Sequence, residues 1–231
     1  DWDDLPPHQR PEAELLRPLV THKGAAAWCP APRSGPTRVL YPHEVVDGRK
    51  RAVDLTRYPK AARYLELHRE RLEGRSYVVD AGRQWYEIWV PQDPDAWPRT
   101  RIVFPDISAS PKFFLDTSGD IVNGDCYWLT VREGVPEDYL FLILAVANSG
   151  LSQRFHDAVF NNRLYAGRRR YITQYVGRYP LPDPQAAASI RAIELARRVS
   201  SGAEKADRET MDRIDALIEE AFGVASGETM R

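Results

Sequence analysis

The residues best suited to contact a partner molecule are arginines gathered in one stretch of the sequence. No acidic residue occurs from Ala158 through Pro182. The side chains that we expect to bind there are Arg163, Arg168, Arg169, Arg170, Tyr171 and Arg178. Arginine carries a planar fork of N–H donors that bridges phosphates or binds O6 and N7 of guanine. We therefore expect an outward-facing loop that meets a polyanion. The alternatives are a solvated basic face, or ion pairs with Asp and Glu of the last two helices.

Three further side chains are weaker candidates for DNA contact. Lys112 precedes the turn-rich stretch "FFLDTSGD", and Arg99 and Gln84 lie in a segment rich in tryptophan and proline. Alternation along a strand predicts that Trp85 and Trp89 pack one face of a sheet. Base stacking by exposed aromatic rings is the alternative for these two residues. Trp97, which lies between two prolines, is expected to anchor a loop.

Residue patterns typical of catalysis are missing from the sequence. There is no Gly-rich dinucleotide loop, no P-loop and no Gly-x-Ser-x-Gly elbow, and the five histidines are scattered. Asp116, Asp120 and Asp125 lie among Ser, Gly and Asn, which favours a solvated turn over an acid–base pair. Cys29 and Cys126 are far apart and form no zinc-binding pattern. We expect no catalytic residue and no metal in this chain. The alternative that the chain is a small enzyme whose site the sequence does not reveal stays open.

Composition limits the electrostatic argument to local surfaces. The formal net charge of the 231 residues is −1, so the chain as a whole does not attract nucleic acid. Five of the 32 basic residues are Lys and the remaining 27 are Arg, a bias that a GC-rich genome would also produce. The start lacks the features of a signal peptide, and the apolar run 139–147 is too short to cross a bilayer. We expect a cytoplasmic protein without a membrane partner, and, since the first residue is not Met, a part of a longer protein.

Hydrophobic periodicity predicts a mixture of helices and strands. Helices are expected at 12–20, 58–73, 137–148, 151–160, 184–199 and 204–222. Strands are expected at 37–42, 76–79, 86–90, 101–104 and 126–131. We divide the chain into a leading arm (1–36), an α+β domain (37–182), a helical hairpin (183–224) and a tail (225–231).

Seven segments, in the same order, resemble the C-terminal specificity domain of TaqI-like adenine DNA methyltransferases and related restriction–modification enzymes. They are "ELLRPLV" (14–20), "YLELHRERLEGR" (64–75), "WYEIWVP" (85–91), "PRTRIVFPDIS" (98–108), "YLFLILAVANSGL" (139–151), "YVGRYPLP" (175–182) and "IDALIEEAFGV" (214–224). Arg101 occupies a position at which the family usually has lysine. The adenine-methylase tetrapeptide, Asn or Asp followed by Pro-Pro and an aromatic residue, is absent.

The resemblance implies a mixed-sheet target-recognition domain that ends in a helical hairpin. Its implied function is to read double-stranded DNA and hold it for base flipping. The implied partner is an upstream methyltransferase catalytic domain, in cis or in trans, that uses S-adenosylmethionine. A protein-interaction or scaffold module of a phage-defence system, without DNA contact, is the alternative function. The resemblance leaves open the recognised bases and whether the full protein also cleaves DNA.

Overall fold

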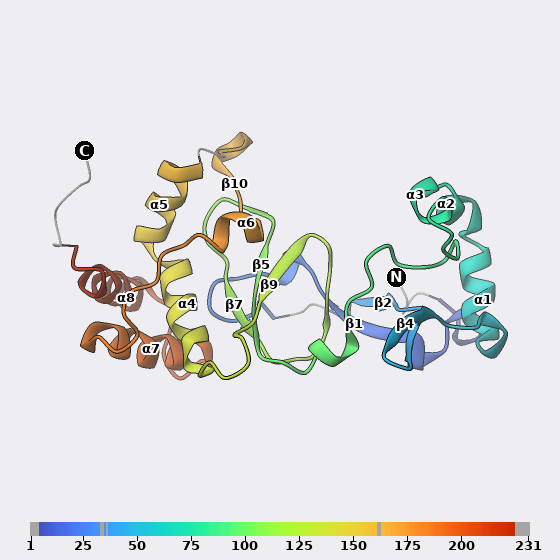
Figure 1. Cartoon of the computed structure of the whole chain (residues 1–231), viewed down its shortest axis with the longest axis horizontal. Helices are drawn as coiled ribbons and strands as arrows, with labels where there is room; N and C mark the ends of the chain where they lie inside the picture. Colours follow the sequence, from blue (N-terminus) through green and yellow to red (C-terminus); the bar gives the residue numbers. More distant parts are fainter. Residues whose placement is uncertain (1–4, 33–34, 36, 161–162, 225–231) are drawn as a thin grey trace. The chain divides into compact units, whose positions relative to one another are not determined.

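The chain forms two compact units, each built from two separate stretches of sequence. The computed structural model describes residues 5–32, 35, 37–160 and 163–224. Unit 1 comprises Asp1–Leu19 and Gly35–Trp97, and unit 2 comprises Val20–Ser34 and Pro98–Arg231 (Figure 1). The expected tail at 225–231 lies outside the described residues. Over the part of the chain that is described, no helix has both the length and the apolar character needed to cross a membrane.

Unit 1 combines short strands with short helices around a small core. Its elements are η2 (Pro7–Gln9), η3 (Ala13–Leu15), β1 (Leu16–Val20, which runs on into unit 2), β2 (Arg38–Leu40), β3 (His43–Val46), β4 (Arg49–Ala52), η5 (Leu55–Arg57), α1 (Pro59–Glu66), α2 (Arg69–Glu73), α3 (Ser76–Val79) and η6 (Pro94–Ala96). Strands β1 and β2 pair antiparallel, as do β3 and β4. Leu15, Val53 and Ala61 form the buried centre.

The helix predicted at 12–20 is wrong. The chain forms one 3₁₀ turn and then strand β1, in which Leu16 pairs with Leu40 and Pro18 with Arg38. Proline lacks an N–H and clashes with the preceding helical turn, so Pro18 disfavours a continuous helix. The helix predicted at 58–73 is present but divided into α1 and α2, with an interruption at Leu67 and His68.

The strands predicted at 76–79 and 86–90 are also wrong. The first segment is helix α3, and the second is a series of turns. Arginine side chains bind the carbonyl groups that a strand ladder would otherwise satisfy. Arg75 Nη2 donates to the Trp85 carbonyl at 2.6 Å, and Arg83 Nη1 donates to the Ile88 carbonyl at 3.3 Å. Trp85 and Trp89 therefore do not share a sheet face.

Unit 2 contains a small antiparallel sheet and most of the helical structure. Its elements are η4 (His22–Gly24), β5 (Arg101–Pro105), β6 (Ile107–Ser108), β7 (Phe114–Asp116), β8 (Ile121–Val122), β9 (Cys126–Leu129), α4 (Asp138–Asn148), α5 (Gly150–Phe160), η7 (Tyr165–Gly167), β10 (Arg169–Arg170), α6 (Thr173–Val176), α7 (Ala187–Ser200) and α8 (Arg208–Ala221). The strand order is β7-β5-β9, with Val103 opposite both Phe114 and Trp128.

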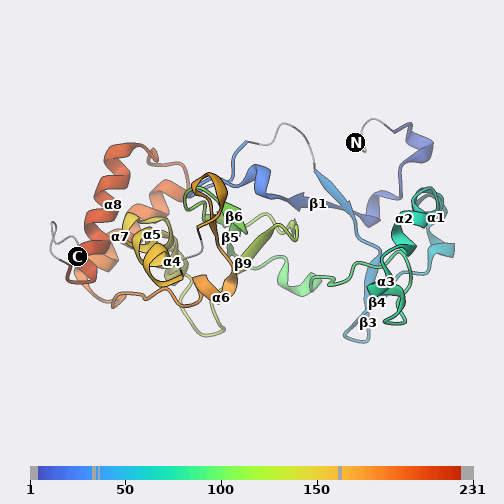
Figure 2. The ribbon, with the colours of Figure 1, turned by 90° about the horizontal axis from the view of Figure 1, so that it is seen from above.

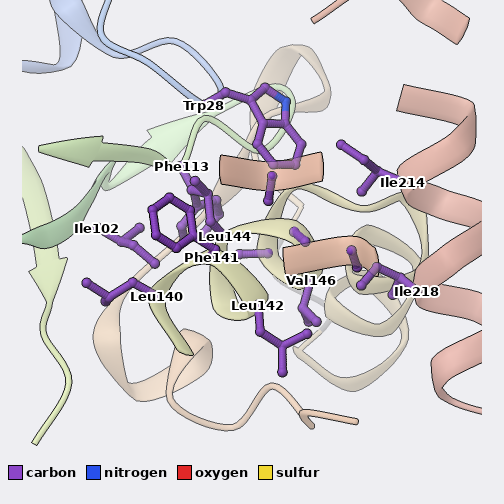
Figure 3. Packing of buried hydrophobic residues seen from close by; sticks show 14 of the residues in the cluster. Trp28, Ile102, Phe113, Leu140, Phe141, Leu142, Leu144, Val146, Ile214 and Ile218 are labelled. Carbon is purple, nitrogen blue, oxygen red and sulfur yellow. The ribbon is translucent and has the colours of Figure 1, made fainter. Parts of the chain in front are cut away.

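Helix α4 is the centre of the larger core. Its sequence is apolar on almost every side, as expected for a helix surrounded by protein. Leu140, Leu142 and Leu144 are fully buried, and helices α7 and α8 pack around them (Figure 3). Trp28 lies in the same cluster, and its indole N–H donates to Met211 Sδ at 3.1 Å. The predicted α+β fold class with a C-terminal helical hairpin is confirmed.

Polar groups at the end of α4 tie the helices to the sheet and to one another. Asn148 accepts from the Phe113 amide at 3.1 Å and donates to the Phe113 carbonyl at 2.9 Å. The Gly150 amide, at the start of α5, donates to Asp215 Oδ1 of α8 at 2.9 Å. Burial is the main cause that raises the pKa of the Asp215 carboxyl, although the Gly150 amide opposes it.

The solvated turn predicted for the three aspartates is wrong for Asp116. Its side chain is buried and pairs with Arg101, whose Nη2 lies 2.7 Å from Asp116 Oδ2. Arg101 also donates to the Asp120 carbonyl. Asp125 pairs with the His22 ring. These contacts fix the 116–125 connection to the sheet rather than forming an acid–base pair.

Candidate nucleic-acid interface

The arginine stretch, residues 163–178, contains a tight turn followed by a short strand. Ala166 and Gly167 both have positive φ angles, 53° and 66°, which reverse the chain within two residues. Strand β10 then pairs antiparallel with β6, with Arg169 opposite Ser108 and Arg170 opposite Ile107. This pairing brings the arginines next to the segment that follows β5.

Asp157 of α5 holds two of the arginines. Arg169 Nε donates to Asp157 Oδ1 at 2.6 Å, and Arg163 Nη2 donates to Asp157 Oδ2 at 2.9 Å. The hydrogen bond from Arg169 is the main cause that lowers the pKa of the Asp157 carboxyl. The same bond raises the pKa of the Arg169 guanidinium. Arg169 also donates to the Ala109 carbonyl at 2.7 Å, so its guanidinium is largely enclosed.

Asp106 holds a third arginine. Arg170 Nε donates to Asp106 Oδ1 at 3.1 Å, and its Nη2 donates to Oδ2 at 3.2 Å. The hydrogen bond to Asp106 raises the pKa of the Arg170 guanidinium. Our expectation of outward-facing arginines is wrong for Arg169, whose side chain is 11% exposed. Arg163 and Arg170 face outward, but each is paired with a carboxylate. The alternative of ion pairs was right in kind but named the wrong acids, since Asp157 and Asp106 lie outside the last two helices.

Arg168 and Arg178 differ from the other three arginines. Both side chains are exposed, and no carboxylate lies within 4.0 Å of either guanidinium among the residues that the structure describes. Arg168 lies over the ring of Tyr165, with its guanidinium carbon 5.4 Å from the ring centroid. Arg178 lies over Phe160 at 5.1 Å. Stacking on an aromatic face orients a guanidinium without neutralising it, so these two charges are available to an anion.

Tyr171 does not fit its expected role as a DNA contact. The side chain is 1% exposed and packs against His156, with the two ring centroids 4.8 Å apart. Burial raises the pKa of the Tyr171 hydroxyl, which has no hydrogen-bond partner among the described residues. Tyr179 lies beside it and shares a hydrogen bond of 2.8 Å with His156 Nδ1. An alternating strand places Tyr171 on the side opposite Arg170, which explains why one faces the core.

The three weaker candidates lie at different places. Lys112 is half-buried and follows Ala109, which contacts Arg169, so its segment runs near the arginine stretch. Arg99 is exposed and donates to the Val131 carbonyl at 3.5 Å. It precedes the first residue of β5, whereas Asp106 follows the last residue of that strand. Gln84 is exposed in unit 1, where its backbone amide donates to Glu87 Oε1. The structure therefore associates only the Lys112 segment with the arginines of unit 2.

The sequence reasoning missed the two aspartates that organise the site. Asp157, in α5, immediately precedes the stretch without acidic residues. The sequence therefore already showed a carboxylate close to these arginines. Asp106 lies 64 residues from Arg170, and only the pairing of β10 with β6 brings them together. Over the described part of the chain, no group of three or more His, Cys, Asp or Glu side chains could hold a metal ion.

Comparison with known families decides what kind of domain carries this arrangement. A family model described as the TaqI-like C-terminal specificity domain matches residues 47–181, more than half of the chain. The chain belongs to this family. The resemblance inferred from the sequence motifs is thereby confirmed, and the matched region of the TaqI-like domain includes both the arginine stretch and most of unit 1.

Relatives of this TaqI-like domain occur as parts of longer proteins. The Type II methyltransferase M.BanIII of Aneurinibacillus aneurinilyticus is 45% identical over 225 residues, which cover 96% of this chain and 39% of that protein. The Type II methyltransferase M.PaeR7I of Pseudomonas aeruginosa is 28% identical over 131 residues, 56% of this chain and 22% of that protein. The chain thus spans about two fifths or less of the length of these relatives.

A solved structure shares the fold. The Type IIL restriction–modification enzyme MmeI, solved in complex with DNA, superposes with a TM-score of 0.59 over 94% of this chain and 29% of that one. The two sequences are 13% identical, so the likeness establishes the fold alone.

Proposed function

We propose that this chain is the double-stranded DNA recognition domain of a restriction–modification adenine DNA methyltransferase. The observation that carries the proposal is the 45% identity to a Type II methyltransferase over 96% of the chain. In this role the domain binds the duplex and positions one adenine for flipping, because an exocyclic amine inside the stack cannot reach a transferase pocket. The methyl group comes from S-adenosylmethionine bound to a catalytic domain, in cis or in trans.

The chemistry of the arginine stretch supports this role. Arg168 and Arg178 supply exposed positive charges held on aromatic rings, suited to phosphates or to a guanine edge. Asp106 and Asp157 fix the neighbouring arginines, so that the loop enters the complex already ordered. Preorganised groups lose less conformational entropy on binding than mobile ones. The proposal includes a cytoplasmic location and a role in defence.

A second candidate function has one observation in its favour. Three of the five arginines between residues 158 and 182 are ion-paired within the chain, which suits a structural stretch of a protein-interaction module. In that case the domain would act in the same kind of defence system without contacting DNA.

Selection from a random duplex pool distinguishes the two functions. The full chain is incubated with the pool at about 0.1 M salt, and the retained DNA is sequenced. A recognition domain enriches one short motif, since each wrong base pair costs about 1–3 kcal/mol. A scaffold module retains no preferred sequence. A variant in which both Arg168 and Arg178 are replaced by Gln should lose the enrichment if the arginine stretch makes the contact.

A further inference from the structure

Unit 1 contains a basic β-hairpin with a two-residue turn. Strands β3 and β4 are joined by Asp47 and Gly48, whose φ angles of 51° and 71° are those of a type I′ turn. In the pairing, Val45 lies opposite Lys50 and Val46 opposite Arg49. Figures 1 and 2 agree that the turn end of this hairpin lies away from α1 and α2 of the same unit.

The hairpin carries three consecutive cations. Arg49, Lys50 and Arg51 are all exposed. Alternation puts Arg49 and Arg51 on one face of the ribbon, and Lys50 on the other, where its Nζ donates to the Pro91 carbonyl at 2.9 Å. Within the described ranges, neither Arg49 nor Arg51 has a carboxylate within 4.0 Å. Glu44 lies opposite Arg51 in the pairing, but its carboxylate pairs with Arg57. Arg49 and Arg51 therefore form no ion pair with another described residue.

The base of the hairpin is fixed in the protein interior. His43, at the start of β3, is buried, and its Nε2 accepts from the Ile88 amide at 3.0 Å. Burial is the main cause that lowers the pKa of His43 to about 4, so the ring is neutral and can accept this bond at neutral pH. Tyr41 packs against His43 with ring centroids 5.2 Å apart and donates to the Gln92 carbonyl at 2.6 Å. The ribbon is thus held at its base and solvated at its tip.

An exposed aromatic surface accompanies the hairpin. Trp89 lies between Ile88 and Pro91, both of which hydrogen-bond to the ribbon, and its side chain is 42% exposed. Arg83 lies over the Trp89 ring at 4.8 Å, and Tyr77 contacts it edge-on at 5.3 Å. Our expectation that Trp89 packs a sheet is wrong. An exposed indole can stack on a nucleic-acid base, and such stacking tolerates any base.

We propose that the β3–β4 hairpin enters the major groove of duplex DNA, with Arg49 and Arg51 in contact with the duplex. The inference rests on the proposed function and assigns a second contact surface for it. The major groove of B-DNA is about 12 Å wide and admits a two-stranded β-ribbon. Two unpaired guanidinium groups on one ribbon face complement the phosphates or the guanine edges that line this groove. A single strand lacks a groove and would not require a rigid ribbon.

Binding of the full chain to its selected duplex, followed by fluorescence anisotropy at several salt concentrations, tests the hairpin. The test variant is R49Q/R51Q. The matched control is K60Q/R63Q, which removes the same charge from exposed positions of α1 in the same unit. If both arginines meet phosphates, the slope of log affinity against log salt falls in magnitude by about 1.8, and affinity at 0.1 M salt falls by about 60-fold. The control should change affinity by less than about threefold.

The outcomes separate this inference from the proposed function. If the wild-type chain binds the duplex and R49Q/R51Q behaves like K60Q/R63Q, the hairpin inference fails while DNA recognition stands. If the wild-type chain binds no duplex, the proposed function fails and the hairpin inference fails with it. An equal loss of affinity for single-stranded DNA would also overturn insertion into a groove. Thermal unfolding of each variant verifies that the exposed substitutions leave the fold intact.

Discussion

Both carboxylate oxygens of Asp157 accept hydrogen bonds from the guanidinium of Arg169. The two hydrogen bonds, from Nε and Nη2, measure 2.6 Å and 2.7 Å, and the Arg169 side chain is only 11% exposed. Paired N–H groups that meet both oxygens of a carboxylate give a strong and directional contact. The pair therefore joins helix α5 to strand β10 and fixes the loop from which Arg168 projects.

Removing this carboxylate should destabilise the fold. Asp157→Ala leaves Arg169 enclosed without its acceptor, which should lower the free energy of unfolding by about 1–3 kcal/mol. Urea unfolding followed by circular dichroism measures the change. The control is Asp212→Ala, because Asp212 is exposed and lies 3.9 Å from Arg208, and such surface pairs contribute about 0–1 kcal/mol. Equal losses in the two variants would contradict a structural role for Asp157.

Asp215 should make stability depend on pH in the acid range. Burial is the largest cause that raises its folded-state pKa above the ordinary value of 3.8, so the folded chain keeps this proton to a higher pH than the unfolded chain. The contribution of Asp215 to stability is therefore fully present below about pH 3.8 and declines as pH rises through the raised pKa. Asp215→Asn keeps an acceptor for Gly150 but cannot titrate.

Urea unfolding of both proteins between about pH 3 and pH 6 measures the effect of Asp215. Stability of the wild-type chain relative to Asp215→Asn should fall as pH rises across that window. A constant difference, or one that grows with pH, would show that the Asp215 pKa is not raised.

Arg101 offers a test of a buried ion pair. Its side chain is 2% exposed, and its Nη2 lies 2.7 Å from Asp116 Oδ2. Arg101→Met leaves Asp116 buried without a cation and should cost about 3–5 kcal/mol. Arg101→Lys keeps the charge but loses donors, including the one that meets the Asp120 carbonyl, and should cost about 1–2 kcal/mol. Thermal or urea unfolding ranks the two variants, and an equal cost would contradict the ion-pair account.

Long periodic segments were predictable from the sequence, whereas short ones were not. Helices α4, α7 and α8 form where apolar residues repeat with helical spacing or fill the whole surface, because their burial outweighs local alternatives. Segment 86–90 was also predicted as a strand, but the Arg83 side chain binds the carbonyls of Ile88 and Trp89 and keeps the segment out of a sheet. Local patterns of four or five residues do not contain that information.

The hairpin of unit 1 shows a signal that was present but undervalued. Asp47-Gly48 between Val45-Val46 and Arg49-Lys50 is the dipeptide that favours a type I′ turn between two strands. We nevertheless predicted no strand between residues 42 and 76 from the sequence. In unit 2 the arginine stretch was readable from its composition, but the aspartates that neutralise part of it depend on tertiary pairing and were not.

The most direct test of the account is the salt dependence of duplex binding by the full chain. Arg168→Gln/Arg178→Gln removes the two arginines of the stretch that lack carboxylate partners within the described residues, and Arg191→Gln/Arg197→Gln removes two that are paired on α7. The account predicts steep salt dependence for the wild-type chain, a decrease of about 1.8 in slope for the first variant, and little change for the second. A wild-type slope near zero, or the same slope in all three proteins, would contradict it.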